Sequence, residues 1–195
     1  MVDPLPFVTY TFVMSITPGP NNVMLTASGA SFGFRRTVPH ILGIGCGFVV
    51  QLLAVCAGLA ALFTRWPSLQ SALAWAGAAY LVYLGWQMLG SGDPQSRAAH
   101  QPVSFRQAAL FQFLNPKAWV MTVTAATLFL PHELGPLLSG AYMAGVMEAI
   151  GLPCMMVWAL FGTSLKRFIG APRGRLAFNV SMALALGVTA VMMVR

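Results

Sequence analysis

Charged residues are scarce in this chain of 195 amino acids: only 8% are Asp, Glu, Lys or Arg, and just 4 are acidic. A soluble domain carries about 25% charged residues, so this sequence could not cover the surface of one. Residues of the hydrophobic set instead make up 57%, and the 19 glycines suit closely packed membrane helices. The composition therefore predicts an integral membrane protein in a lipid bilayer.

Three further absences narrow the class of membrane protein. The three cysteines lie inside apolar segments, which predicts no structural disulfide. No Lys or Arg precedes the first apolar stretch, so we expect no cleaved signal peptide and a retained first span. The net charge of +7 comes from basic residues scattered through loops, without a basic helix face, which argues against nucleic acid as a partner.

The histidines are too dispersed for metal binding. We expect all three at loops or span ends, as interface residues without a ligand role: His40, His100 and His132. An intramembrane enzyme would need a nucleophile beside a base, and the apolar segments offer Ser15, Ser28 and Glu148 but no buried histidine. The sequence therefore predicts no metal, no cofactor and no enzymatic activity.

Six apolar segments follow one another along the chain, each near or above the roughly 20 residues that a membrane-spanning helix needs. We place them at residues 5–28, 38–63, 68–89, 107–130, 136–163 and 175–194. The longest polar interruption, at about residues 90–106, is a connector between two halves at about 1–90 and 107–195. We expect one all-α membrane domain, residues 1–195, with six transmembrane helices.

Lys and Arg are distributed unequally between the loops on the two sides of the membrane. One side carries only Arg65 and Arg195, whereas eight basic residues follow the first, third and fifth spans: Arg35, Arg36, Arg97, Arg106, Lys166, Arg167, Arg173 and Arg175. Cytoplasmic loops carry the excess of Lys and Arg. We therefore expect these three loops in the cytoplasm and both chain termini outside.

The most unusual segment is Thr17-Pro18-Gly19-Pro20-Asn21-Asn22, in the middle of the first apolar run. Its two prolines remove backbone donors and interrupt the helix at mid-depth, where lipid tolerates no unpaired backbone. The break must face protein or a watery cavity, which makes it a candidate site for a polar solute. This arrangement is typical of transporters.

The fourth apolar run contains a second interruption, Asn115-Pro116-Lys117. An ammonium group at mid-membrane is costly unless it faces polar groups, so we expect Lys117 to face the protein interior. Alternatively, the span begins near Ala118 and Lys117 reaches the cytoplasmic interface. A shift of 98 residues aligns Pro18 with Pro116. The sequence thus predicts a 3+3 inverted repeat with helices 1 and 4 interrupted by proline motifs.

These two motifs, together with Ser31-Phe32-Gly33-Phe34-Arg35 and residues 75–81, resemble the LysE/RhtB family of bacterial amino-acid exporters, most closely its cysteine/O-acetylserine subgroup. The resemblance covers nearly the whole chain in order. It implies efflux of a small neutral amino acid or derivative across the bacterial inner membrane, driven by protons. In that membrane, the outside position that the loop charges predict for both termini is the periplasm. An exporter of homoserine or threonine in the same family is one alternative, and a channel is another.

An amino-acid zwitterion needs donors for its carboxylate and acceptors for its ammonium group. Helix N-termini after Pro20 and Pro116 offer free amides to the carboxylate, and carbonyls freed before each proline could accept from the ammonium. The asparagines could bind substrate or cap the restarted helices. Lys117 could pair with the substrate carboxylate or with Glu148. The candidate substrate-binding residues are Thr17, Pro18, Gly19, Pro20, Asn21, Asn22, Gln51, Gln112, Asn115, Pro116 and Lys117.

Glu148 is the acidic residue that lies well inside an apolar segment. Burial favours the protonated form of a carboxyl group, which makes Glu148 the candidate for proton coupling. The alternatives are a plain salt bridge to Lys117 and a position nearer the membrane edge.

Two features of the second apolar run concern helix packing. Gln51 carries an amide in mid-helix and needs an interior partner. Gly43, Gly45 and Gly47 lack the strand context of a nucleotide-binding loop, so we expect close helix packing of the GxxxG kind. A GxxxG face is also consistent with a homodimer.

Overall fold

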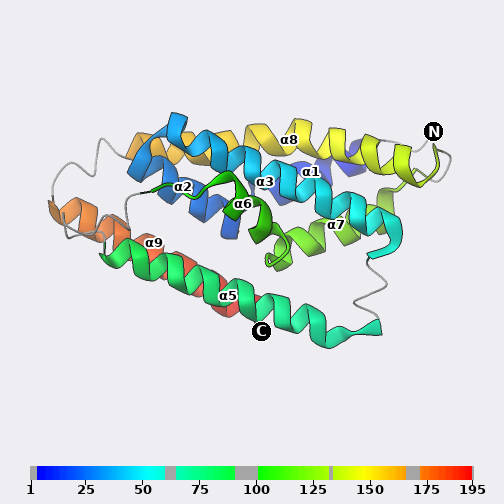
Figure 1. Cartoon of the computed structure of the whole chain (residues 1–195). Helices are drawn as coiled ribbons and strands as arrows, with labels where there is room; N and C mark the ends of the chain where they lie inside the picture. The colour runs from blue at the N-terminus through cyan, green and yellow to red at the C-terminus, as the bar shows by residue number, and fades with distance from the viewer. Residues whose placement is uncertain (1–3, 60–64, 91–100, 132–133, 166–171, 195) are drawn as a thin grey trace.

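The computed structural model describes residues 4–59, 65–90, 101–131, 134–165 and 172–194, and the regular structure in these ranges is helical throughout (Figure 1). The elements are α1 (Leu5–Ile16), α2 (Pro20–Phe32), α3 (Phe34–Ala54), the π-helical turn η1 (Val55–Leu59), α5 (Pro67–Gly90), α6 (Phe105–Gln112), α7 (Pro116–Phe129), α8 (Pro136–Leu165) and α9 (Pro172–Met193). The predicted all-α class is confirmed. Most of the predicted connector lies outside the described residues.

Four helices are long and apolar enough to cross a membrane: Phe34–Leu59, Pro67–Leu89, Leu138–Leu165 and Leu176–Met193. They match the predicted second, third, fifth and sixth spans, although the second begins at Phe34 and not at residue 38. The predicted first and fourth spans each consist of two shorter helices in tandem, α1 with α2 and α6 with α7. The protein is therefore a multi-pass membrane protein, while the count of six spans stays a prediction.

Both predicted interruptions are present, and each ends at a proline that starts the next helix. Thr17 is extended (φ −66°, ψ 146°) after α1, and Gly19 is extended (φ −174°, ψ 176°) before Pro20 opens α2. Asn115 (φ −93°, ψ 106°) likewise precedes Pro116, which opens α7. A residue before proline avoids the helical region, and proline suits the first helical position. Local chemistry thus fixes where both helices restart.

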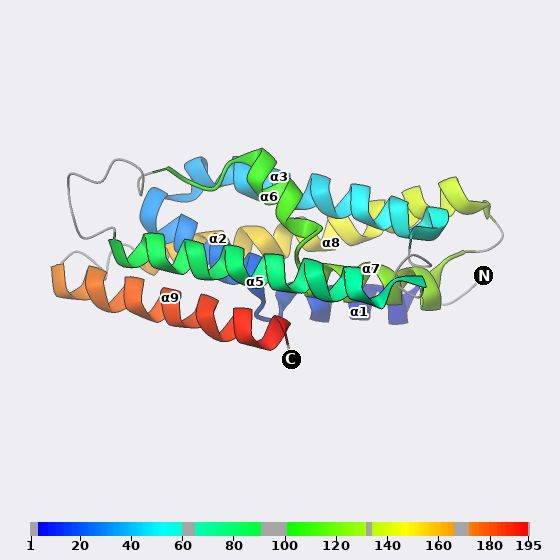
Figure 2. The same cartoon turned by 60° about the horizontal axis from the view of Figure 1, so that its bottom comes forward.

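Figures 1 and 2 show α1, α2, α3, α6, α7 and α8 gathered in one bundle, with α5 and α9 as a pair along one side. Within the bundle, α8 packs against α1, α2 and α3, and α3 packs against α6. The outer pair contacts the bundle where α9 meets α2 and where Tyr80 of α5 packs on Phe111 of α6. The bundle interior contains a buried cluster around Phe7, Phe48 and Met147. Both interrupted helices contribute to this core, α1 through Phe7 and α7 through Ala118 and Met121.

Glycines allow the closest helix contacts in the bundle. A Cβ atom at Gly43 would lie 2.3 Å from the carbonyl oxygen of Phe105, and one at Gly47 would lie 2.4 Å from that of Ala109. The predicted GxxxG packing is confirmed, and its partner is α6 of the same chain. Because this face is buried within the chain, it gives no support to a homodimer.

His40 departs from its predicted position. It lies in the second turn of α3, directly after Pro39, and its side chain is completely buried. Neither ring nitrogen has a hydrogen-bond partner in the described part of the chain. The expectation of an interface residue is wrong because α3 begins earlier than predicted and carries His40 into the bundle. His100 and His132 lie outside the described residues.

Candidate functional site

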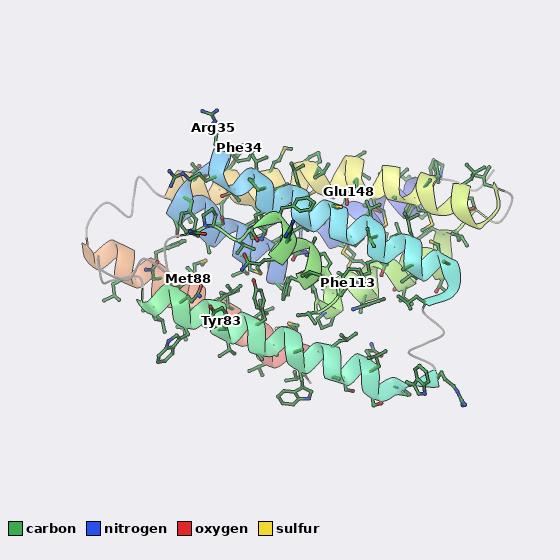
Figure 3. The ribbon with its side chains drawn as sticks, viewed as in Figure 1. Phe34, Arg35, Tyr83, Met88, Phe113 and Glu148 are labelled. Atoms are coloured by element: carbon green, nitrogen blue, oxygen red, sulfur yellow. The ribbon has the colours of Figure 1, made fainter. Side chains whose placement is uncertain are left out.

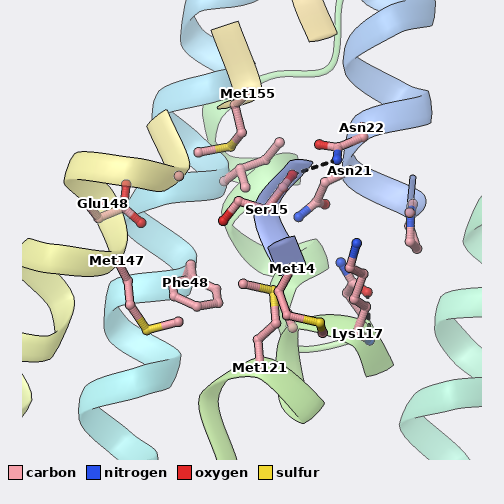
Figure 4. A pocket seen from close by; sticks show the side chains of 16 residues that line it. Met14, Ser15, Asn21, Asn22, Phe48, Lys117, Met121, Met147, Glu148 and Met155 are labelled. Carbon is pink, nitrogen blue, oxygen red and sulfur yellow. Dashed lines mark hydrogen bonds between the residues drawn. The ribbon is translucent and has the colours of Figure 1, made fainter. Parts of the chain in front are cut away.

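A cavity of about 60 Å³ lies where the first helix break meets α3, α7 and α8 (Figure 4). This volume holds several water molecules or a small solute. Of the predicted site residues, it brings together Gly19, Pro20, Asn21, Asn22, Asn115, Lys117 and Glu148. Three further predicted residues do not line the cavity. Thr17 accepts a hydrogen bond from Lys117, Gln112 bonds to Asn21, and Gln51 donates to Gln112. Pro18 contributes a carbonyl to Lys117, and Pro116 serves to start α7.

Lys117 connects the two helix breaks. Its ammonium nitrogen Nζ donates to the carbonyl oxygen of Thr17 at 2.9 Å, to the Thr17 hydroxyl at 3.0 Å and to the carbonyl oxygen of Pro18 at 3.3 Å. Its stem packs on Gly19, where a Cβ atom would lie 2.8 Å from Lys117 Cδ. The side chain is half-buried and faces the protein interior, as predicted. Its depth in the membrane, mid-span or at the cytoplasmic interface, stays a prediction.

A second connection between the breaks is made of amides. Asn21 Nδ2 donates to Gln112 Oε1 at 2.9 Å, and Gln112 Nε2 donates back to Asn21 Oδ1 at 3.2 Å. Gln51 Nε2 donates to the carbonyl oxygen of Gln112 at 3.0 Å, so the predicted interior partner of Gln51 exists. Gln51 and Gln112 are completely buried. They brace the end of α6 and do not line the cavity.

The carbonyl groups freed at the breaks already accept hydrogen bonds from side chains. Asn22 Nδ2 donates to the carbonyl oxygens of Ser15 at 2.9 Å and Thr17 at 2.8 Å, and Trp158 Nε1 donates to that of Ile16 at 3.1 Å. At the second break, Trp119 Nε1 donates to the carbonyl oxygen of Phe113 at 2.9 Å. Side chains of the chain itself therefore satisfy these backbone groups. Binding of a substrate ammonium by the freed carbonyls stays a prediction.

Of the three asparagines, Asn115 has the capping role expected from sequence, while substrate binding by the asparagines stays a prediction. Asn115 caps α7, since its Oδ1 accepts from the backbone nitrogen of Lys117 at 3.1 Å. The capping position of α2 is instead Gly19, which makes no side-chain cap. Asn21 and Asn22 follow it inside the first turn, where backbone N–H groups have no intrahelical acceptor. Capping therefore explains Asn115 and not the other two.

Glu148 lies on α8, on the far side of the cavity from Lys117 (Figure 4). Its carboxylate packs against α3 at Gly45, where a Cβ atom would lie 2.6 Å from Glu148 Oε2. Within the described residues, Glu148 has neither a hydrogen bond nor an ion pair. The Lys117–Glu148 salt bridge considered from sequence is absent there, because Lys117 is bound to the first break. Figure 3 shows Glu148 among the side chains of the whole bundle.

Apart from Ser15, the rest of the cavity wall is apolar, and it was not identified from sequence. It includes four methionines and a phenyl ring: Met14, Phe48, Met121, Met147 and Met155. Thioether side chains are flexible and adapt to the shape of a bound group. With 12 methionines spread along the chain, nothing in the sequence distinguished these. Trp119 and Trp158 could have been suspected, because a buried indole N–H needs an acceptor.

The fold and the cavity together define a membrane transport protein: apolar helices surround a polar cavity set between two helix breaks. No group of three or more His, Cys, Asp or Glu side chains suited to a metal ion occurs among the described residues. The chain belongs to the LysE type translocator family, whose family model matches residues 12–195.

The chain is also similar to cysteine/O-acetylserine efflux proteins of Escherichia coli (strain K12), Shigella flexneri serotype 5b (strain 8401) and Shigella sonnei (strain Ss046). Each is 33% identical over 181 residues, which cover 92% of this chain and 91% of the relative. No solved structure matches the chain significantly. The family and these relatives identify a transporter and not an enzyme.

Proposed function

We propose that this protein is a secondary active exporter of small neutral amino acids or their derivatives, such as cysteine and O-acetylserine, in the bacterial inner membrane. Family membership supports export, and the efflux proteins to which the chain is similar support the substrate class. The observation that carries the proposal is the polarity of the cavity, which has Glu148 on one side and Lys117 with three asparagines on the other.

This polarity suits a zwitterion. The substrate carboxylate would lie at the start of α2, where the backbone N–H groups of Asn21 and Asn22 are free of helical bonds and the helix dipole is positive. The Lys117 ammonium adds a positive charge on the same side. The substrate ammonium would lie against the carboxylate of Glu148, and its side chain against the methionine and phenyl wall.

The position of Glu148 supports proton coupling. A carboxylate in an apolar helix needs a cation or a proton to offset its charge. Glu148 would hold the substrate ammonium in the loaded carrier and a proton in the empty one, so that each replaces the other. Such competition for one carboxylate couples the outward step of the amino acid to the inward step of a proton.

The architecture proposed for this exchange is one unit of six spans in two inverted halves, with the termini in the periplasm. The pattern of packing supports it: α1 lies on α8 as α6 lies on α3, while α3 pairs with α8 and α5 with α9. When each helix is replaced by its counterpart in the other half, the α1–α8 contact becomes the α6–α3 contact. The α3–α8 and α5–α9 contacts each map onto themselves. The excess of Lys and Arg in three loops supports the orientation.

Tracer counterflow in proteoliposomes tests the function. Vesicles loaded with unlabelled amino acid should accumulate labelled cysteine or O-acetylserine saturably, more strongly than threonine or leucine. Preference for threonine or homoserine would assign the protein to a different substrate in the same family. Ion current driven by voltage, without amino-acid selectivity, would contradict a carrier and favour a channel.

A further inference from the structure

The ammonium group of Lys117 binds three oxygen atoms of a single chain segment. Three oxygens of Thr17 and Pro18 lie within 3.3 Å of Nζ, two of them backbone carbonyls and one a hydroxyl. They come from the first break, 99 and 100 residues before the lysine in sequence. Gly19 leaves space for the stem, since a Cβ atom there would lie 2.8 Å from Lys117 Cδ.

Such a set of oxygens is the kind of site that holds an alkali-metal ion. In transporters with interrupted helices, carbonyl groups of the unwound segment coordinate a coupling cation. An ammonium group and a potassium ion carry the same charge and are similar in size. Here the cation is part of the protein and enters from the start of α7.

We propose that Lys117 is a tethered cation: its ammonium group fills a monovalent-cation site formed by Thr17 and Pro18 at the first helix break. The lysine neutralises the carbonyl dipoles of that break, holds it against α7 and keeps a positive charge beside the cavity. It is thus a positioning residue for the first break. The protein needs no free sodium or potassium ion at this place.

The test is to remove the ammonium and supply a free cation. Lys117→Ala removes the ammonium group from the three oxygens and leaves space beside them for a free cation. We expect the full-length K117A protein in detergent to have a lower Tm than wild type in choline chloride. Methylammonium or potassium chloride at the same ionic strength should raise that Tm saturably, by about 3 °C or more. The wild-type Tm should be the same in all three salts.

Two variants separate a cation site from general stabilisation. Lys117→Met keeps a long stem against Gly19 and fills the space, so its Tm should not respond to either cation. Adding Thr17→Val to K117A removes one of the three oxygens and should raise the methylammonium concentration needed for half of the effect about tenfold.

Three results would overturn the proposal: one Tm for K117A in all three salts, an equal response in wild type or K117M, or no folded K117A in any of the salts. The inference deepens the proposed export function at the same site. Because Tm is measured without substrate, its outcome does not depend on which compound is exported, and either proposal can fail alone.

Discussion

Lys117 and Glu148 are the charged side chains on the described cavity wall, and they differ in their hydrogen bonding. Lys117 is bound by three oxygens, whereas Glu148 lies against Gly45 without a hydrogen bond in the described residues. Sequence predicts that both face the interior, since lipid does not accept unpaired charge. It could not predict their partners, because the contact of Lys117 with Thr17 joins positions 100 residues apart.

Replacing Glu148 by Gln keeps the shape of the side chain, but the amide carries no charge and cannot bind or release a proton as a carboxyl group does. We expect E148Q to insert and fold normally and to lose efflux driven by a pH gradient. The measurement is substrate efflux from proteoliposomes with and without an imposed gradient. Met156→Leu, an exposed position on the same helix, is the control and should behave as wild type. Undiminished proton-driven efflux by E148Q would remove this residue from the mechanism.

Gly45 offers a way to move the Glu148 carboxylate without altering it. A methyl group at Gly45 would lie 2.6 Å from Oε2, so Gly45→Ala must displace the end of this flexible side chain. We expect transport to fall by about tenfold or more, because displaced groups lose their alignment with substrate, while Tm changes little. Gly145→Ala is the matched control, since nothing lies within 4 Å of its added Cβ atom. Equal transport by the two variants would contradict the role given to Glu148.

At the scale of the element, the helix breaks are local and the helix contacts are not. Proline chemistry predicts that α2 and α7 restart at Pro20 and Pro116, and the structure agrees. Sequence did not predict that α2 and α8 cross at glycines. A Cβ atom at Gly29 would lie 2.2 Å from the carbonyl oxygen of Ala159, and one at Gly162 would lie 2.1 Å from that of Thr26. These two contacts depend on how α2 and α8, which are distant in sequence, are placed relative to each other.

Gly162→Ala should destabilise the protein because the added methyl group would clash with the backbone carbonyl of Thr26, which is less able to move than a side chain. Overpacking of this kind costs about 1–3 kcal/mol, which would appear as a lower Tm in detergent. Gly187→Ala in α9 has nothing within 4 Å of its new Cβ atom and should leave Tm unchanged. A Tm for Gly162→Ala equal to that of this control would show that α2 and α8 do not pack so closely.

The break itself can be tested with the double variant Pro18→Ala and Pro20→Ala. It restores two backbone donors and permits α1 and α2 to join, which would remove the carbonyls that hold Lys117. We expect counterflow to be lost while the protein still inserts into the membrane. Transport equal to wild type would show that an interrupted helix is not required.

At the scale of the whole molecule, composition and the lengths of the apolar runs predicted the class and most spans, whereas the long-range packing could not be predicted. Scarce charge established a membrane protein, and four of the expected spans are single helices in the structure. The GxxxG motif shows the limit of sequence: it predicts close packing, but only the fold shows that its partner is α6 of the same chain. The position of His40 was missed for a similar reason, because it depends on where α3 begins.

The central claim is that the cavity between the two breaks binds an amino acid by both of its charges. The most direct measurement is competition in the proteoliposome counterflow assay with labelled cysteine. Unlabelled cysteine should compete, whereas its N-acetyl and carboxamide derivatives, each lacking one charge, should compete at least about tenfold more weakly. Equal competition by the free amino acid and both derivatives would contradict a cavity organised by Glu148 on one side and the start of α2 with Lys117 on the other.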